Sequence, residues 1–188
     1  MRITLGTIRD VLRSAFGRDS FVASFIKEVV EGENCPTAGI DAQGVMRYNP
    51  SFVGQYVTSP ADLFCLIAHE LMHPIFGHFV YEGGQPENIG ADMVINATIS
   101  LLFARHSVSG AMFRRFYKPI GIEGLLRPGS DMHQSRYARL YRDFYDNHCI
   151  GQKLSTGEVI QALKVLTPTV EVPTIILLGS HEFRDCTR

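Results

Sequence analysis

The sequence lacks the features that would place it in a membrane, on nucleic acid or in a disulfide-linked fold. No apolar run reaches the roughly 18 residues that a membrane-spanning helix needs. Neither sign of charge dominates: 18 Lys and Arg stand against 19 Asp and Glu, for a formal net charge of −1, which argues against broad binding to nucleic acid or to an anionic membrane surface. The four cysteines show no CxxC spacing, so we expect reduced and mostly buried thiols.

The N-terminus also lacks the marks of a signal peptide, since residues 1–10 contain neither a long apolar core nor a small-residue cleavage site. We therefore expect the protein to be cytoplasmic. What the chain does have is a globular composition, with 45% hydrophobic and 20% charged residues over 188 positions. This length suits a single domain that spans residues 1–188 and buries about 70% of its unfolded surface.

One stretch of the chain indicates a chemistry, the HExxH pentad His69-Glu70-Leu71-Met72-His73. Residues four apart lie on one face of a helix, so His69 and His73 can offer two imidazole nitrogens to the same metal ion. Two neutral imidazoles and an open position suit Zn²⁺, and Glu70 can reach a water in that position as a general base. The competing interpretation is a buried helix with two hydrogen-bonded histidines.

The residues around the pentad predict a buried helix. Ser59 as N-cap and Pro60 at the first helical position form a start signal. The helix is apolar nearly all round, which places it in a core, where imidazoles and a carboxylate without partners would be costly and a metal would satisfy them. Pro74 should kink the helix just after the second histidine, and Gly77 offers a place to stop.

A catalytic zinc needs a third protein ligand, and we favour Asp92. Asn88, Asp92 and Asn96 are spaced four apart, so they form a polar stripe on an otherwise apolar helix. We expect Asp92 to bind the metal and the two asparagines to orient it. A solvated helix face is the alternative for this stripe.

Two histidines are the alternative third ligands. His78 lies off the metal face unless the chain turns at Gly77, and a role in packing or in orienting a ligand suits it better. His181 follows an expected strand and could be a ligand, a surface residue or a donor to the developing oxyanion, a role that Tyr48 could also take.

Hydrophobic periodicity predicts an α+β fold that is mainly helical, with a small β-sheet. The expected helices cover residues 7–31, 51–56, 60–80, 87–105, 135–147 and 155–166, and the expected extended segments cover residues 40–49 and 173–179. Within the first extended segment, Val45–Tyr48 should be an edge strand on which a peptide aligns through backbone hydrogen bonds. Residues 107–135, rich in Gly and Pro, should form a long irregular connection, such as a lid or cleft wall.

Four blocks of the sequence resemble the N-terminal domain of a bacterial family of HExxH metallopeptidase-like proteins that carry a C-terminal VWA-like domain. The blocks are residues 36–41, 48–53, 67–78 and 88–96, in the order and spacing of that family. The resemblance implies a zincin-like core, in which an edge strand lies beside the HExxH helix and an Asp-bearing helix lies behind it.

The resemblance has two departures. Pro74 stands where related sequences more often have Leu or Val, and the Asp-x-Ser-x-Ser metal motif of a VWA module is absent from the sequence. We therefore expect a stand-alone or truncated form, with a separate protein partner in place of the missing VWA-like domain. The associated AAA+ ATPase that the second domain usually implies is not expected on this basis.

These observations predict a zinc-dependent metallopeptidase that acts on a peptide or protein. Zn²⁺ would be held by His69, His73 and Asp92, and Glu70 would take a proton from the water and pass it to the leaving amine. The main rival is a degenerate zincin that binds a protein without cutting it, but such a scaffold would not need Glu70. A deformylase or amidase is less well supported, because deformylases use a Cys ligand upstream of HExxH and Cys35 lacks the expected neighbours.

Overall fold

The computed structural model describes residues 2–17, 21–81, 84–103, 111–146, 155–167 and 176–179, and the structural statements below concern these residues. The chain divides into two compact units. The first unit comprises residues 1–78 and 178–188, and the second comprises residues 79–177. The fold is α+β and mainly helical, with a small three-stranded sheet, which confirms the predicted fold class. The single domain over residues 1–188 stays a prediction.

The sheet of the first unit has the order β1-β3-β2, with β1 (Glu28–Glu31) parallel to β3 (Val45–Tyr48) and β2 (Ala38–Ile40) antiparallel to it. The prediction that Val45–Tyr48 is an edge strand is therefore wrong, because β3 is the central strand and β2 is an edge. The hydrophobic pattern of a segment can predict a strand, but it does not predict the order of strands in a sheet. Here β1 pairs with the side of β3 that faces away from β2, so β3 becomes the central strand.

The hairpin turn follows from two residues. The Asp41 side chain accepts the backbone N–H groups of Gln43 and Val45, at 3.0 and 2.9 Å. Gly44 has a φ of 83°, a conformation that glycine adopts without strain. The predicted extended segment and its turn are confirmed.

The helical prediction for residues 7–31 holds only for its first part. Helix α1 spans Leu5–Phe16 and a short 3₁₀ helix spans Phe21–Ser24, but β1 replaces the end of the expected helix. The Lys27 N–H donates to the Gly44 carbonyl at 2.9 Å, next to the parallel β1–β3 ladder. A pairing with residues distant in sequence thus overrides the local periodicity.

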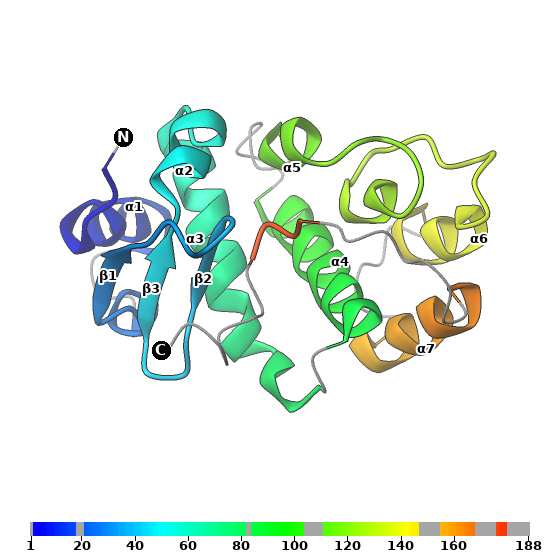
Figure 1. Cartoon of the computed structure of the whole chain (residues 1–188), viewed down its shortest axis with the longest axis horizontal. Coiled ribbons are helices and arrows are strands. Elements are labelled where there is room, and N and C mark those ends of the chain that lie inside the picture. The colour runs from blue at the N-terminus through cyan, green and yellow to red at the C-terminus, as the bar shows by residue number, and fades with distance from the viewer. Residues whose placement is uncertain are drawn as a thin grey trace. The chain divides into compact units, whose positions relative to one another are not determined.

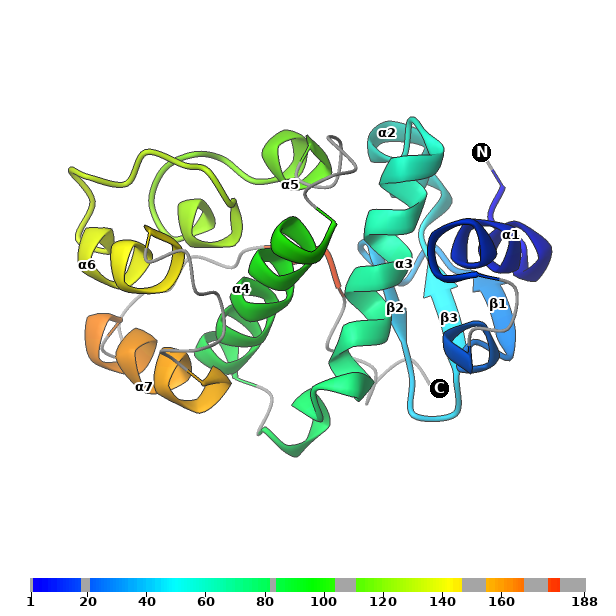
Figure 2. The ribbon, with the colours of Figure 1, turned by 180° about the vertical axis from the view of Figure 1, so that it is seen from behind.

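Helices α1 and α3 cover the same face of the sheet, as the two opposite views in Figures 1 and 2 show. Between sheet and α3 the chain forms α2 (Pro50–Tyr56), which Asn49 caps by accepting the Ser51 N–H at 2.9 Å. This confirms the short helix expected over residues 51–56. The arrangement places α3 against the edge strand β2.

Helix α3 spans Pro60–Ile75 and carries the pentad. It begins where the sequence predicts, since the Ser59 hydroxyl accepts the Asp62 N–H at 3.1 Å and Pro60 is the first helical residue. It ends five residues before the expected residue 80, because Gly77 turns the chain with a φ of 68°. A short 3₁₀ helix, His78–Val80, follows.

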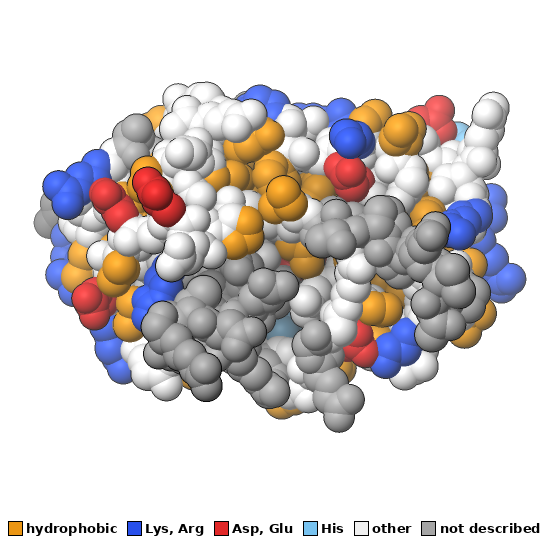
Figure 3. Space-filling model, in the orientation of Figure 1, with side chains coloured by type: hydrophobic (Ala, Val, Ile, Leu, Met, Phe, Trp, Pro, Cys, Tyr) orange, Lys and Arg blue, Asp and Glu red, His pale blue; other side chains and the backbone are white. Residues whose placement is uncertain are grey.

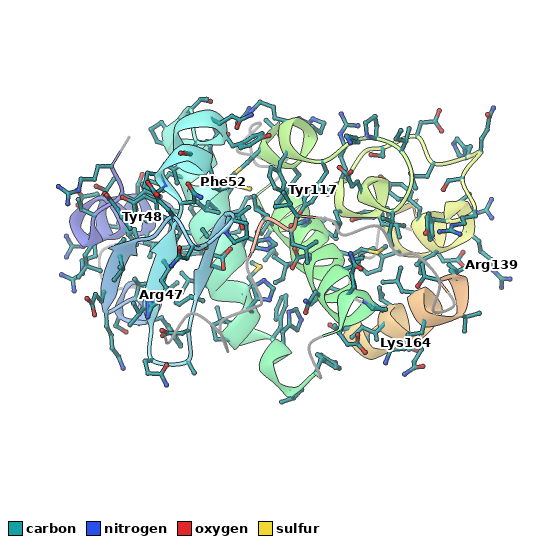
Figure 4. The ribbon with its side chains drawn as sticks, in the orientation of Figure 1. Arg47, Tyr48, Phe52, Tyr117, Arg139 and Lys164 are labelled. Atoms are coloured by element: carbon teal, nitrogen blue, oxygen red, sulfur yellow. The ribbon has the colours of Figure 1, made fainter. Side chains whose placement is uncertain are left out.

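The second unit is built on the pairing of α4 (Gln85–Leu102) with α7 (Thr156–Leu166), which confirms the two helices predicted there. The helices approach closely at Gly90, where a methyl group would lie 2.7 Å from Ile160 Cγ1. An ion pair joins the same helices, with Lys164 Nζ 2.5 Å from Glu87 Oε1 (Figure 4 labels Lys164).

The remaining elements of the second unit are α5 (Ala111–Phe116), a 3₁₀ helix (Glu123–Leu126), α6 (Ala138–Tyr141) and a π-helical turn (Arg142–Asp146). The expected connection over residues 107–135 is therefore partly helical. The helix predicted over 135–147 is shorter and changes to π geometry. The Tyr145 hydroxyl donates to the Leu125 carbonyl at 2.6 Å, which ties the π turn to the 3₁₀ helix.

Two further observations concern the surface and the thiols. On the face shown in Figure 3, basic and acidic side chains of the described residues are interspersed and do not form one large patch of a single sign. Of the helices in the described ranges, none is both long and apolar enough to span a membrane. Cys35 and Cys65 are buried as predicted, and Cys149 and Cys186 lie outside the described residues.

Candidate metal centre

His69 and His73 lie one turn apart on α3 of the first unit, and their rings meet edge to face. Their Nε2 atoms are 3.3 Å apart, with ring centroids 5.1 Å apart and ring planes at 74°. Both side chains are buried. The predicted juxtaposition of the two imidazoles is therefore present, through the Nε2 atom of each.

The separation of these nitrogens fits a shared zinc ion. Two nitrogens that each lie about 2.05 Å from a tetrahedral Zn²⁺ are about 3.3 Å apart. The alternative, a direct N–H···N hydrogen bond between the rings, would be at the long end of the usual range. The spacing of the two nitrogens is compatible with a shared ion and with a ring-to-ring hydrogen bond.

Glu70 faces the same place as the two imidazoles. A methyl group built on Gly179 would lie 3.1 Å from Glu70 Oε1 and 3.2 Å from the Nε2 atoms of His69 and His73. Three atoms of the pentad therefore converge on one point, which lies beside the backbone of Gly179. Glu70 is 1% exposed, so its carboxylate meets that point in a site shielded from solvent. The convergence of two imidazoles and a carboxylate is the arrangement that a metal and a general base require.

His78 meets His73 on the other ring nitrogen. The Nδ1 atoms of His73 and His78 are 3.3 Å apart, and the ring centroids are 5.4 Å apart. His78 could be a metal ligand only if the chain turned at Gly77, and the chain does turn there. The ring of His78, however, lies against Nδ1 of His73 and not beside the two Nε2 atoms. A partner on Nδ1 fixes the orientation of the ring and leaves Nε2 as the donor towards a metal.

Asp92 belongs to the second unit, in the middle of α4, and is 0% exposed. Its role as the third ligand stays a prediction. The Asn96 amide donates to the Leu126 carbonyl at 2.9 Å and so connects α4 to the 3₁₀ helix Glu123–Leu126. Asn88 is half-buried. The expectation that the two asparagines orient Asp92 is likewise untested.

The Tyr48 hydroxyl has a structural role. It donates to Glu31 Oε1 at 2.7 Å and accepts the Ile3 N–H at 3.1 Å, so it attaches the N-terminal segment to β1 and β3 (Figure 4). Burial, followed by the hydrogen bond to Glu31, raises the pKa of Tyr48. These bonds contradict the expectation that Tyr48 stabilises an oxyanion. His181, the other expected donor, lies outside the described residues.

The residue that sequence reasoning missed is Gly179. It forms an isolated parallel bridge with Ala38 of β2 and comes within contact distance of the pentad. The sequence places it at the end of a short apolar segment, which predicts a strand but not the strand's neighbour. Only the folded chain shows that this glycine lies against His69, Glu70 and His73.

The comparisons with known proteins give no relative: no family model matches the chain, and no curated protein or solved structure matches it. The function proposed below is therefore argued from the geometry of the chain's own residues.

Proposed function

We propose that the protein is a zinc-dependent metallopeptidase. The observation that supports it is the convergence of His69 Nε2, His73 Nε2 and Glu70 Oε1 on one point beside Gly179. Two imidazoles one helical turn apart with an adjacent carboxylate are the donor set and general base of an HExxH hydrolase. The 3.3 Å spacing of the two nitrogens suits a tetrahedral ion.

The third ligand in this proposal is Asp92. Its carboxylate is fully buried, and a buried carboxylate is costly unless hydrogen bonds or a cation compensate its charge. Two nitrogens and one carboxylate oxygen form a common ligand set for catalytic zinc, and they leave one position open for water or substrate. His78 supports the set by holding the ring of His73 through Nδ1.

The residues of the chain carry the proton transfers. A bound Zn²⁺ would polarise the scissile carbonyl and lower the pKa of water in the open position. Glu70 would accept a proton from the attacking water and donate it to the nitrogen of the leaving amine, so that one carboxylate would serve as base and acid in turn. The burial of Glu70 excludes bulk water from this exchange.

The test combines metal analysis with a peptide-library assay. We expect one zinc per chain and chelator-sensitive cleavage in the wild-type protein. Glu70→Gln should bind zinc as the wild type does but lose about 10²–10⁴-fold in rate, because the general base is removed and the ligands are kept. Glu33→Gln, an exposed change in the same unit, is the matched control and should cleave normally. A wild-type protein without zinc, or full activity in Glu70→Gln, contradicts the proposal.

A further inference from the structure

The outer side of β2 is the edge of the sheet that lies against the pentad helix. β2 is an edge strand in the order β1-β3-β2, and it contacts α3. Within the described ranges, the residue that bridges to this outer side is Gly179, opposite Ala38 and in parallel orientation. A residue distant in sequence thus pairs with the edge strand at a single position, beside His69, Glu70 and His73.

Leu178 and Gly179 differ in what they contribute at this edge. The Leu178 side chain is buried, at 0% exposed, and the residue belongs to the first unit. Gly179 lies next to the pentad on the side where a side chain would be. A methyl group there would lie 3.1–3.2 Å from Glu70 Oε1 and from the Nε2 atoms of His69 and His73. The leucine therefore anchors the segment, and the glycine lets the backbone lie directly over the centre.

A peptide that binds by strand addition makes the same kinds of contact. Its backbone pairs with an edge strand, and a side chain beside the paired residue fills a buried position. Gly179 already pairs with Ala38 of β2, and the neighbouring Leu178 side chain already occupies a buried position. A second extended backbone cannot pair with Ala38 while Gly179 is in place.

We propose that Leu178 and Gly179 form a strap that occupies the peptide-binding edge of β2 and closes the metal centre, so that a substrate peptide enters only after the strap leaves. That the entering molecule is a peptide substrate rests on the proposed function. That the strap covers the centre rests only on the contacts of Leu178 and Gly179. One isolated bridge and one buried leucine hold the strap in place, a smaller contact than a full strand makes, so local opening does not require the unit to unfold.

The main experiment uses Leu178→Ala in the full chain. The control is Leu12→Ala, because Leu12 is also 0% exposed and lies in the same unit, on α1. Two rates are measured: hydrogen exchange of the Ala38 amide, and removal of zinc by a chelator from the loaded protein. We expect Leu178→Ala to raise both at least about tenfold, because removing buried side-chain atoms favours the open state of the strap. Leu12→Ala should change them only as far as it lowers global stability.

A second variant, Gly179→Ala, tests the close approach directly. Its methyl group would lie 3.1–3.2 Å from Glu70, His69 and His73, which are packed and buried, so we expect the strap to be weakened and the Ala38 amide to exchange faster. The strap is refuted if both leucine variants behave alike after correction for stability, or if Gly179→Ala leaves exchange and zinc release unchanged.

The outcomes also separate this proposal from the proposed function. A wild-type protein that binds no zinc refutes the peptidase, while amide exchange still decides the strap. Faster exchange and zinc release in Leu178→Ala, without any peptide cleavage, support the strap and contradict the peptidase. A rise in peptide cleavage together with faster exchange supports both.

Discussion

The Nδ1 atom of His78 lies 3.3 Å from the Nδ1 atom of His73. The Nε2 atom of His73 is at the same time 3.3 Å from Nε2 of His69, so the ring of His73 is held on both of its nitrogens. The sharp turn at Gly77 makes this possible, because it ends α3 and returns His78 to the helix. The orientation of the His73 Nε2 atom thus depends on a residue beyond the helix.

Replacing His78 should therefore weaken zinc binding without removing a ligand. We expect His78→Ala to raise the zinc Kd by about 10–100-fold, the usual effect of losing a residue that orients a ligand. His78→Asn should restore part of the affinity, since its amide can still bond to an imidazole nitrogen. Competition with a zinc-binding dye measures the Kd, and exposed His133→Ala is the control. Equal Kd values for wild type and His78→Ala would contradict the orienting role.

Asp92→Ala should lower zinc affinity by more than the change at His78, because it would remove one of three protein ligands. Asp92→Asn should be intermediate, as an amide oxygen is a neutral and weaker donor. Metal content after dialysis against a graded chelator measures the effect, with exposed Asp131→Asn as the control. Full occupancy in Asp92→Ala would direct the search for the third ligand to His181.

The turn at Gly77 predicts opposite effects for two glycine-to-alanine changes. Gly77 has a φ of 68° and open space around it, so alanine there adds backbone strain alone, and we expect a loss of about 1 kcal/mol in the free energy of unfolding. Gly54 lies within α2 with equally open surroundings, so alanine should stabilise by about 0.5–1 kcal/mol. Denaturant unfolding of both variants distinguishes strain from packing. A loss at Gly54 equal to that at Gly77 would contradict this explanation.

Tyr145 should make the second unit sensitive to alkali. Burial, and then the neighbouring Tyr141, raise the pKa of Tyr145 well above its usual value. A pKa raised in the folded state stabilises the fold fully below the unfolded value of about 10, and this contribution declines as the pH rises through the folded pKa. Tyr145→Phe should lose the hydrogen bond to Leu125 yet show a flatter decline in stability above about pH 10. Thermal unfolding of the wild type and of Tyr145→Phe above about pH 10 tests this prediction. If stability declines with pH equally steeply in both proteins, the prediction is wrong.

The sequence predicts best those features that depend on neighbouring residues. Ser59 and Pro60 locate the start of α3, and Asn49 locates the start of α2, because a cap needs only the backbone of the next turn. The spacing of His69 and His73 likewise requires only a helix. These features could be inferred without knowing any other part of the chain.

The sequence fails where distant segments meet. The residues of β1 carry a helical periodicity, yet they pair with β3, whose position along the sheet no local signal gives. The same holds for Gly179, whose neighbours come from β2 and α3. The sequence also does not reveal the partners of Tyr48, whose hydroxyl bonds to Glu31 and Ile3, two residues far from it along the chain.

The bridge between Ala38 and Gly179 joins residues that leave the ribosome far apart in time. The residues of the hairpin and of the helix that carries His69 and His73 are synthesised well before Gly179. A nascent chain therefore presents these imidazoles with no glycine above them. In the proposed zinc protein, an ion would therefore be able to reach the two rings without passing Gly179 until that residue has been added.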